Sequence, residues 1–235
     1  MLKYLLPFLI FLLSACSTVT QPILTLPPWD DLITIEAPHG FEIFFDSGAT
    51  HTARDLYVSG SIVLNGSYFW VTDSWVYYPA GLWRSGIIEL SPAIFDDPNI
   101  THVVRISHTE PQNVTIFPNK NLLYMKWGSG DDAFQAGPLV LSGNLLQDFW
   151  DSWHARWEYE RTLIGKTESG KVYFFVSRKR LSLTEVGEQI RIDPRFQHDP
   201  ITVLNLDGWP STVYFDGVLG FREDKKLPIF FRINP

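Results

Sequence analysis

Short runs of β-branched and aromatic residues, each bounded by turn residues, recur along most of the chain. Runs of this kind predict β-strands, because branched and aromatic side chains pack well on a pleated surface. The predicted strands cover residues 41–45, 62–64, 103–106, 114–117, 122–125, 172–176, 201–204 and 212–215.

The segment after Ser182 has helical spacing instead. Ser182 and Glu185 match a capping box, in which each side chain bonds the backbone of the other residue. Val186 and Ile190 then fall on one helical face, and Asp193-Pro194 ends the pattern.

A second helical candidate runs from Leu145 to about Trp157, because Phe149, Trp153 and Trp157 recur at helical spacing. Such a stripe is more typical of a face packed on a core than of a binding site. Strands outnumber helices, so the pattern predicts an α+β fold, with a single β-rich domain and a few packed helices.

Composition narrows the function classes. The 235 residues favour one large domain over two small ones, at about 150 residues per domain. The chain is 45% hydrophobic, which supplies a sizeable core, and its net charge of −7 provides no basic face for nucleic acid. A single cysteine excludes a disulfide framework and a cysteine-rich zinc site.

The N-terminus is typical of a secretory signal: Lys3, an apolar run from Tyr4 to Leu13, and small residues before Cys16. The run is too short for a transmembrane helix, which needs about 20 apolar residues. Leu13-Ser14-Ala15-Cys16 resembles the lipobox of bacterial lipoproteins, in which the cysteine becomes the lipidated, palmitate-bearing first residue. The alternative is a plain signal peptide with an incidental cysteine.

The sequence therefore predicts three parts: a lipoprotein signal peptide over residues 1–15, the lipidated Cys16 with a tether to residue 28, and a folded domain over residues 29–235. The tether is small, polar and proline-containing. A lipid on Cys16 would hold the protein to a bilayer in a bacterial cell envelope. The resemblance implies the outer membrane, facing the periplasm, if the host is Gram-negative.

One segment places an amide and a carboxylate close together. In a strand, Asn205 and Asp207 point to one face, while Leu204 and Leu206 point to the other. Gly208 then permits a turn and close approach of a ligand, and Ser211 adds a hydroxyl. Alone, this pattern is also typical of an ordinary strand and turn with solvated polar groups.

Four segments in order resemble the phosphodiester glycosidase domain family, which includes the catalytic domain of the mannose-6-phosphate uncovering enzyme and bacterial relatives. The similarity covers roughly residues 40 to 220. The matching segments are Asn65-Gly66-Ser67-Tyr68-Phe69, Gly137-Pro138, Arg161-Thr162-Leu163-Ile164-Gly165, and Asn205-Leu206-Asp207-Gly208 with Ser211.

The resemblance implies hydrolysis of a glycosyl phosphodiester at the sugar C1–O bond, by a hydrolase of the glycosidase type. Asp207 would then be the catalytic carboxylate, Asn205 would orient it or a sugar hydroxyl, and Arg161 would bind the phosphate. The implied substrate-binding residues are Asn65, Gly137, Thr162, Gly208, Trp209 and Ser211.

Two departures from the family pattern bear on activity. Ser67 and Trp209 stand where the family has glycine, and Trp209 would either fill space near the ligand or offer a stacking face to a sugar. The alternative function is therefore a non-catalytic glycan-binding or envelope-scaffold lipoprotein on the same fold.

Other chemistry has little support. Asp131, Asp132 and Glu160 are candidates for a second carboxylate, but their spacing from Asp207 in the chain does not choose among them. The six histidines form no metal-binding pair, so the sequence predicts no metal site and no cofactor, and it leaves a role for a divalent cation open. The predicted partners are a glycan or sugar-phosphodiester substrate and a lipid bilayer.

Overall fold

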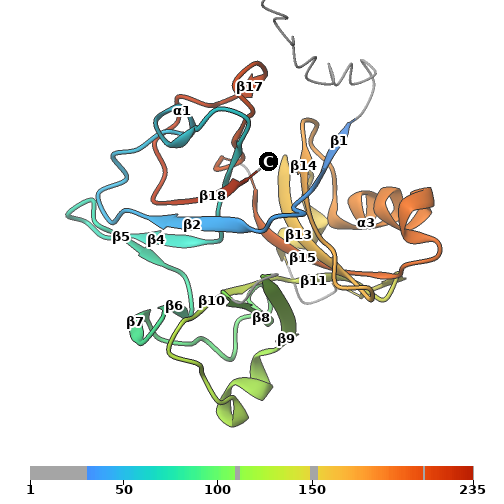
Figure 1. Ribbon diagram of the computed structural model, residues 1–235, viewed down its shortest axis with the longest axis horizontal. Helices are drawn as coiled ribbons and strands as arrows, with labels where there is room; N and C mark the ends of the chain where they lie inside the picture. Colours follow the sequence, from blue (N-terminus) through green and yellow to red (C-terminus); the bar gives the residue numbers. More distant parts are fainter. Residues whose placement is uncertain (1–30, 109–111, 149–152, 209, 235) are drawn as a thin grey trace, which may run out of the picture. The chain divides into compact units, whose positions relative to one another are not determined.

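The computed structural model describes residues 31–108, 112–148, 153–208 and 210–234 (Figure 1). These residues belong to one compact unit that runs from Asp31 to Pro235. The unit is built mostly of β-strands, arranged in several sheets, with few helices. Among the described helices, none has the length and apolar character needed to cross a membrane.

A six-stranded antiparallel sheet forms the centre of the fold. Its inner strands are buried on both faces, because other sheets cover one face and a helix packs on the other. Phe174 and Val176 belong to one core cluster, whereas Tyr173 and Phe175 belong to another. The strand order is β1 (Leu32–Glu36), β14 (Val172–Ser177), β13 (Arg161–Thr167), β15 (Ile201–Gly208), β11 (Leu139–Ser142) and β12 (Leu145–Leu146).

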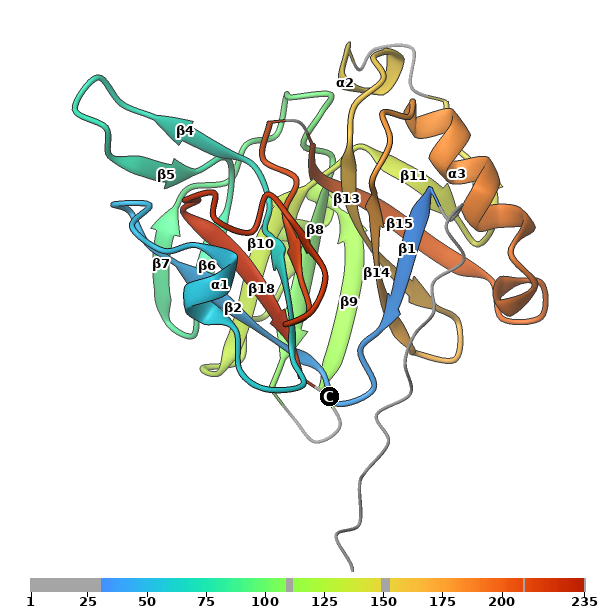
Figure 2. The same ribbon diagram turned by 90° about the horizontal axis from the view of Figure 1, so that it is seen from above.

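Two five-stranded sheets and a hairpin complete the β-structure. The first sheet has the order β7 (Ile88–Ser91), β6 (Trp83–Ser85), β10 (Asp131–Ala136), β8 (His102–Ser107) and β9 (Asn113–Pro118). The second has the order β17 (Gly220–Phe221), β16 (Tyr214–Phe215), β3 (Ile62–Asn65), β18 (Ile229–Ile233) and β2 (Phe41–Phe45). The hairpin pairs β4 (Phe69–Val71) with β5 (Tyr77–Pro79) and extends from the body of the fold (Figure 2).

The three larger sheets share one aromatic core. The ring of Phe231, on β18, lies 5.5 Å from that of Phe174 on β14 and 5.3 Å from that of Phe134 on β10. Phe41 on β2 packs edge-on against Phe174 at 5.0 Å. Each of these rings is buried, so the junction of the three sheets is dry and closely packed.

The helix after Ser182 is confirmed as α3 (Leu183–Ile192), which runs beside the six-stranded sheet (Figure 2). Ser182 and Glu185 form the expected capping box, and α3 ends before Asp193 and the 3-10 helix η2 (Pro194–Phe196). Its buried face packs Val186 and Ile190 into the second core cluster. The remaining helices are short: α1 (Ala53–Leu56), α2 (Trp153–Arg156) and the 3-10 helix η1 (Asn119–Tyr124).

The second helical candidate is wrong at its start. Leu145 and Leu146 form strand β12, which pairs with β11 across a two-residue turn. Gly143 and Asn144 both have positive φ in this turn, the conformation that tight hairpins require. Helix is present only at Trp153–Arg156, and Phe149 lies outside the described residues.

One predicted strand, residues 122–125, is also wrong. Residues 119–124 form η1, which follows Pro118 at the end of β9. The side-chain amide of Asn119 donates to the carbonyls of Ile94 and Ile100 and so fixes the start of the turn. The other predicted strands are observed; most change little at their ends, but the strand predicted at 201–204 extends to Gly208 and the one predicted at 212–215 is reduced to Tyr214–Phe215.

Replacing the helix cap tests the local signal that predicted α3. Ser182→Ala removes the acceptor for the Glu185 backbone N–H, and we expect it to lower the free energy of unfolding by about 1 kcal/mol. Urea denaturation measures this loss. Thr184→Ala, at the second residue of α3, removes no cap and should leave the unfolding midpoint nearly unchanged. An equal loss of stability in both variants would contradict the capping role.

Candidate functional site

The candidate site lies where the start of β13 meets the end of β15. Arg161 pairs with Gly208, and Thr162 pairs with Asp207. The register then shifts by one residue, so that Leu163 pairs with Asn205 and Leu206 is the extra residue of a bulge.

Asn205 is fully buried and joins this strand end to two other segments. Its Nδ2 atom donates to the Tyr68 hydroxyl and, at 3.2 Å, to the carbonyl of Gly137. Because a backbone carbonyl can only accept, the contact with Gly137 identifies this amide atom as nitrogen. The Oδ1 atom has no hydrogen-bond partner among the described residues.

Gly137 and Tyr68 complete this contact. The Tyr68 hydroxyl donates to the Gly137 carbonyl at 2.8 Å, and burial raises the pKa of this hydroxyl. A side chain on Gly137 would come within 2.8 Å of Thr101, so only glycine fits. Gly137 thus contributes a carbonyl acceptor at a place where the backbone is tightly enclosed.

Asn65 ties β3 to the same strand end. It is 1% exposed, and its Oδ1 atom accepts hydrogen bonds from the Thr162 hydroxyl at 2.5 Å and from the Val213 backbone at 3.1 Å. Both acceptor positions of this oxygen are therefore used within the protein. The structure brings Asn65 and Thr162 together, in direct contact with each other.

Asp207 has the most perturbed carboxyl group of the site. Its side chain is partly exposed, its Oδ1 atom accepts from the Gly208 backbone at 2.7 Å, and it is hydrogen-bonded to Ser211. Burial raises the pKa of Asp207 to about 7, although these hydrogen bonds and the charges of Lys225 and Arg161 act in the opposite direction. Asp207 therefore exchanges its proton near neutral pH.

The turn that follows Asp207 is compact. The Ser211 backbone N–H donates to the Gly208 carbonyl at 2.7 Å, which holds Ser211 close to Gly208. A side chain on Gly208 would come within 2.9 Å of the Glu160 carbonyl. Trp209, the predicted stacking residue, lies outside the described residues, as does Cys16.

Arg161 lies beneath this turn with no exposed surface. Its guanidinium donates to the carbonyls of Leu181 at 3.2 Å and Trp157 at 2.5 Å and lies over the ring of Tyr159. Burial lowers the pKa of Arg161, and the nearby Asp207 opposes that shift. The structure thus places Arg161 close to Asp207 but directs two of its donors at backbone carbonyls.

Further charged groups, which the family pattern did not mark, border the site. Glu160 is buried, and its Oε1 atom lies 3.1 Å from Arg222 Nη2 and 3.9 Å from Arg180 Nε. Lys225 donates from Nζ to the Pro210 carbonyl and acts electrostatically on Asp207. In the sequence, Arg222 and Lys225 belong to a mixed charged run of the kind expected on a solvated loop.

The other candidate carboxylates lie elsewhere. Asp131 is paired with Arg105 at 2.5 Å and Asp132 with His108 at 2.7 Å, both at the start of β10. Gly137 follows the opposite end of that strand. Among the described residues, no group of three or more His, Cys, Asp or Glu side chains is placed to hold a metal ion.

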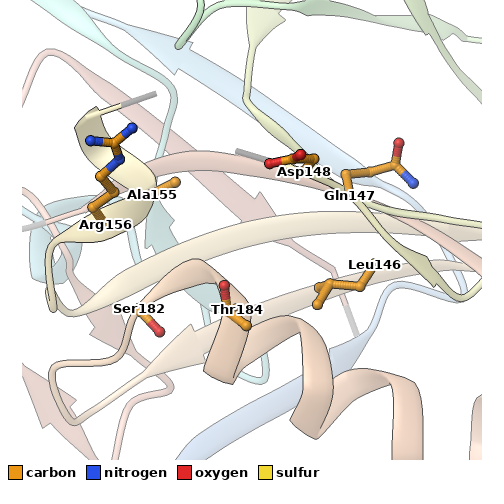
Figure 3. A pocket seen from close by; sticks show the side chains of 7 residues that line it. All are labelled: Leu146, Gln147, Asp148, Ala155, Arg156, Ser182 and Thr184. Carbon is orange, nitrogen blue, oxygen red and sulfur yellow. The ribbon is translucent and has the colours of Figure 1, made fainter. Parts of the chain in front are cut away.

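A cavity of about 630 Å³ lies beside the segments that Arg161 bonds. Figure 3 shows Ser182, the N-cap of α3, and Thr184 of α3 near one side of it and Arg156 of α2 near another. The carbonyls that accept from Arg161 belong to Trp157 and Leu181, which adjoin Arg156 and Ser182 in the chain. Arg161 therefore links two of the segments that line this cavity.

Similarity to known proteins is visible only in the fold. No family model matches the chain, and no curated protein matches it. The catalytic domain of zebrafish N-acetylglucosamine-1-phosphodiester alpha-N-acetylglucosaminidase, auto-inhibited by its pro-peptide, is similar with a TM-score of 0.51 at 14% identity, over 87% of this chain and 73% of that chain.

Two bacterial structures are similar as well. A Burkholderia pseudomallei protein named "Putative exported protein" gives a TM-score of 0.60 at 11% identity, over 87% of this chain and 73% of that chain. A hypothetical protein from Synechocystis gives 0.51 at 12% identity, over 86% of this chain and 59% of that chain. At such identities the likeness establishes the fold alone, and it confirms the predicted β-rich fold of the phosphodiester glycosidase type.

The contact between Asn65 and Thr162 yields a stability prediction. Asn65→Ala would leave the Thr162 hydroxyl and the Val213 N–H without their acceptor, and we expect a loss of about 2–3 kcal/mol in the free energy of unfolding. Urea denaturation measures it. Asn113→Ala, at an exposed position of β9, is the matched control, and a similar loss in the control would argue against the assigned role of Asn65.

Proposed function

We propose that this chain is a hydrolase that releases a sugar from a glycosyl phosphodiester by breaking the C1–O bond. The observation that carries the proposal is the setting of Asp207, a carboxyl group that titrates near pH 7 within a positively charged surround. Four cationic side chains contact or act on the two carboxylates of the site; the cations are Arg161, Arg180, Arg222 and Lys225, and the carboxylates are Glu160 and Asp207.

This local charge favours an anionic substrate. The whole chain carries a net charge of −7, so the charge of a region with more cations than carboxylates has the opposite sign to that of the whole chain. Preorganised cations stabilise the negative charge that grows on a departing phosphate group. A phosphodiester has one such charge, next to the bond that is to be broken.

Asp207 supplies the carboxylate that such a reaction needs. Cleavage at an anomeric carbon passes through an oxocarbenium-like state. A carboxylate can stabilise that state, attack the anomeric carbon, or act as a general base on the attacking water. A phosphate leaving group needs little protonation, so no second carboxyl group is needed as an acid on the leaving side. Ser211 is hydrogen-bonded to Asp207 itself, and Asn205 bonds Tyr68 and Gly137. Asn65 and Thr162 bond each other at the same strand end.

The fold supports the same reaction class. One structurally similar protein is named an N-acetylglucosamine-1-phosphodiester alpha-N-acetylglucosaminidase, so this fold hosts hydrolysis of a sugar phosphodiester. We extend that chemistry to this chain on the strength of Asp207 and its cations, since fold alone does not determine function.

We place the enzyme in a bacterial envelope, anchored by a lipid on Cys16. The lipobox-like sequence, with the single cysteine of the chain at its end, supports this placement. A structurally similar protein with "exported" in its name is consistent with it. Residues 29–235 would then form the catalytic domain, held to the membrane by the tether before it.

A non-catalytic, glycan-binding lipoprotein is the alternative. In the sequence, this alternative rests on Ser67 and Trp209, which stand where the similar family has glycine. Ser67 is buried, and its hydroxyl donates to the Gln135 carbonyl at 2.8 Å, so this departure is absorbed by the fold and does not by itself favour the alternative.

Turnover tests the proposal directly. Protein lacking residues 1–16 should release free sugar from a panel of sugar-1-phosphodiesters, and Asp207→Asn should lower the rate at least about 100-fold. Sugar release is measured by chromatography. Asp224→Asn, at a 78% exposed carboxylate, is the control and should retain full activity. Saccharide binding without turnover of any phosphodiester would instead establish the alternative function.

The pH dependence follows from the pKa of Asp207. If the carboxylate is the working form, kcat/KM rises with pH and levels off above the pKa of about 7. One pH unit below that pKa, the rate should be lower by about tenfold. A pH–rate profile of the wild-type enzyme measures this, and a rate that falls as pH rises through 7 would assign Asp207 the role of an acid.

A further inference from the structure

Lys225 occupies a defined position beside Asp207. It lies between β17 and β18 in a turn closed by its own backbone N–H, which donates to the Arg222 carbonyl at 2.9 Å. Two residues later, the buried side chain of Leu227 fixes the chain to the core. The Lys225 ammonium then donates to the Pro210 carbonyl, in the turn that follows Asp207.

Other cations also act on the two carboxylates of the site that Lys225 shares. Glu160 is engaged by Arg222 and Arg180, which lie 3.1 and 3.9 Å from its Oε1 atom. Asp207 is acted on by Arg161 as well as by Lys225, while burial and the charge of Arg222 lower the pKa of Lys225 itself. The hydrogen-bond acceptor of the ammonium is the neutral Pro210 carbonyl, which brings no negative charge to it.

Arg161, the other cation that acts on Asp207, is less able to reach a ligand. Its side chain has no exposed surface, and two of its donors are directed at the carbonyls of Trp157 and Leu181. Moving it would break those bonds and separate two segments of the chain. Lys225, by contrast, is partly exposed and needs no rearrangement of the core.

We propose that Lys225 is the residue that binds the phosphate of the substrate, and that Arg161 positions the surrounding segments without contacting it. This inference rests on the proposed function for its substrate class, but it concerns an anion site that can be tested without turnover. The ammonium would contact a non-bridging oxygen of the phosphodiester, on the side where Asp207 also lies.

Anion binding measured with dimethyl phosphate tests the inference independently of catalysis. Calorimetric titration of the full chain in detergent should show binding by the wild type and at least tenfold weaker binding by Lys225→Gln. Glutamine removes the charge but keeps a donor for the Pro210 carbonyl, so the local fold is preserved. Lys225→Arg should restore most of the affinity, and Lys226→Met, at the exposed neighbouring lysine, should bind like the wild type.

Kinetics supply a second readout where a substrate is found. Lys225→Gln should raise KM at least tenfold and move the midpoint of the pH–rate profile above 7, because the Lys225 charge lowers the pKa of Asp207. A residue with only a packing role would lower stability without moving this midpoint.

The outcomes separate the two proposals. Dimethyl phosphate binding that depends on Lys225, without sugar release from any phosphodiester, would retain the anion site and overturn the hydrolase. Sugar release with unchanged KM and unchanged dimethyl phosphate affinity in Lys225→Gln would retain the hydrolase and overturn the role of Lys225. Absence of dimethyl phosphate binding by the wild type also overturns it.

Discussion

The meeting of three sheets around Phe231 is the constraint on which the rest of the structure depends. Its ring contacts Phe174 of the six-stranded sheet and Phe134 of β10, so the apolar faces of three sheets are buried together. The neighbouring residue of β18, Phe230, pairs with Asn65. The aromatic junction therefore fixes how far β3 extends toward β13, and so brings the Asn65 amide to the Thr162 hydroxyl. Burial of the aromatic rings and convergence of polar groups at the strand ends are consequences of the same packing.

Sequence patterns predicted what local interactions determine. The capping box at Ser182 and the strand predicted at residues 201–204 depend on neighbours a few positions away; both are observed, and the strand continues to Gly208. The helix predicted to start at Leu145 is wrong there, because a tight turn at Gly143-Asn144 pairs Leu145 and Leu146 with β11 despite the helical spacing of the apolar residues. For the site, the order of motifs indicated which segments converge. It did not indicate Lys225, whose place depends on the path of the chain between β17 and β18 and on a turn that no periodic pattern marks.

Buried polar residues at the strand ends bond mainly to one another and to the backbone. Asn65 accepts from Thr162 and Val213, while Asn205 donates to Tyr68 and Gly137. Each of these groups would be costly to bury alone, since an unpaired polar group in the interior loses its hydration without replacement. Together they form a rigid base for the exposed part of Asp207. Stability thus accounts for these residues as well as any contact with a ligand does.

The glycines Gly66, Gly137 and Gly208 are also required by packing, independently of any ligand. A side chain on Gly66 would overlap Ile229, one on Gly137 would meet Thr101, and one on Gly208 would meet the Glu160 carbonyl. These positions are therefore dictated by close packing whether or not a substrate binds, whereas Ser67 is tolerated because its hydroxyl finds the Gln135 carbonyl. The protonation of Asp207 depends instead on burial and charge. The proton of Asp207 is held by burial and opposed by Lys225 and Arg161, so arrival of an anion beside Lys225 would weaken that opposition and raise the pKa of Asp207 further.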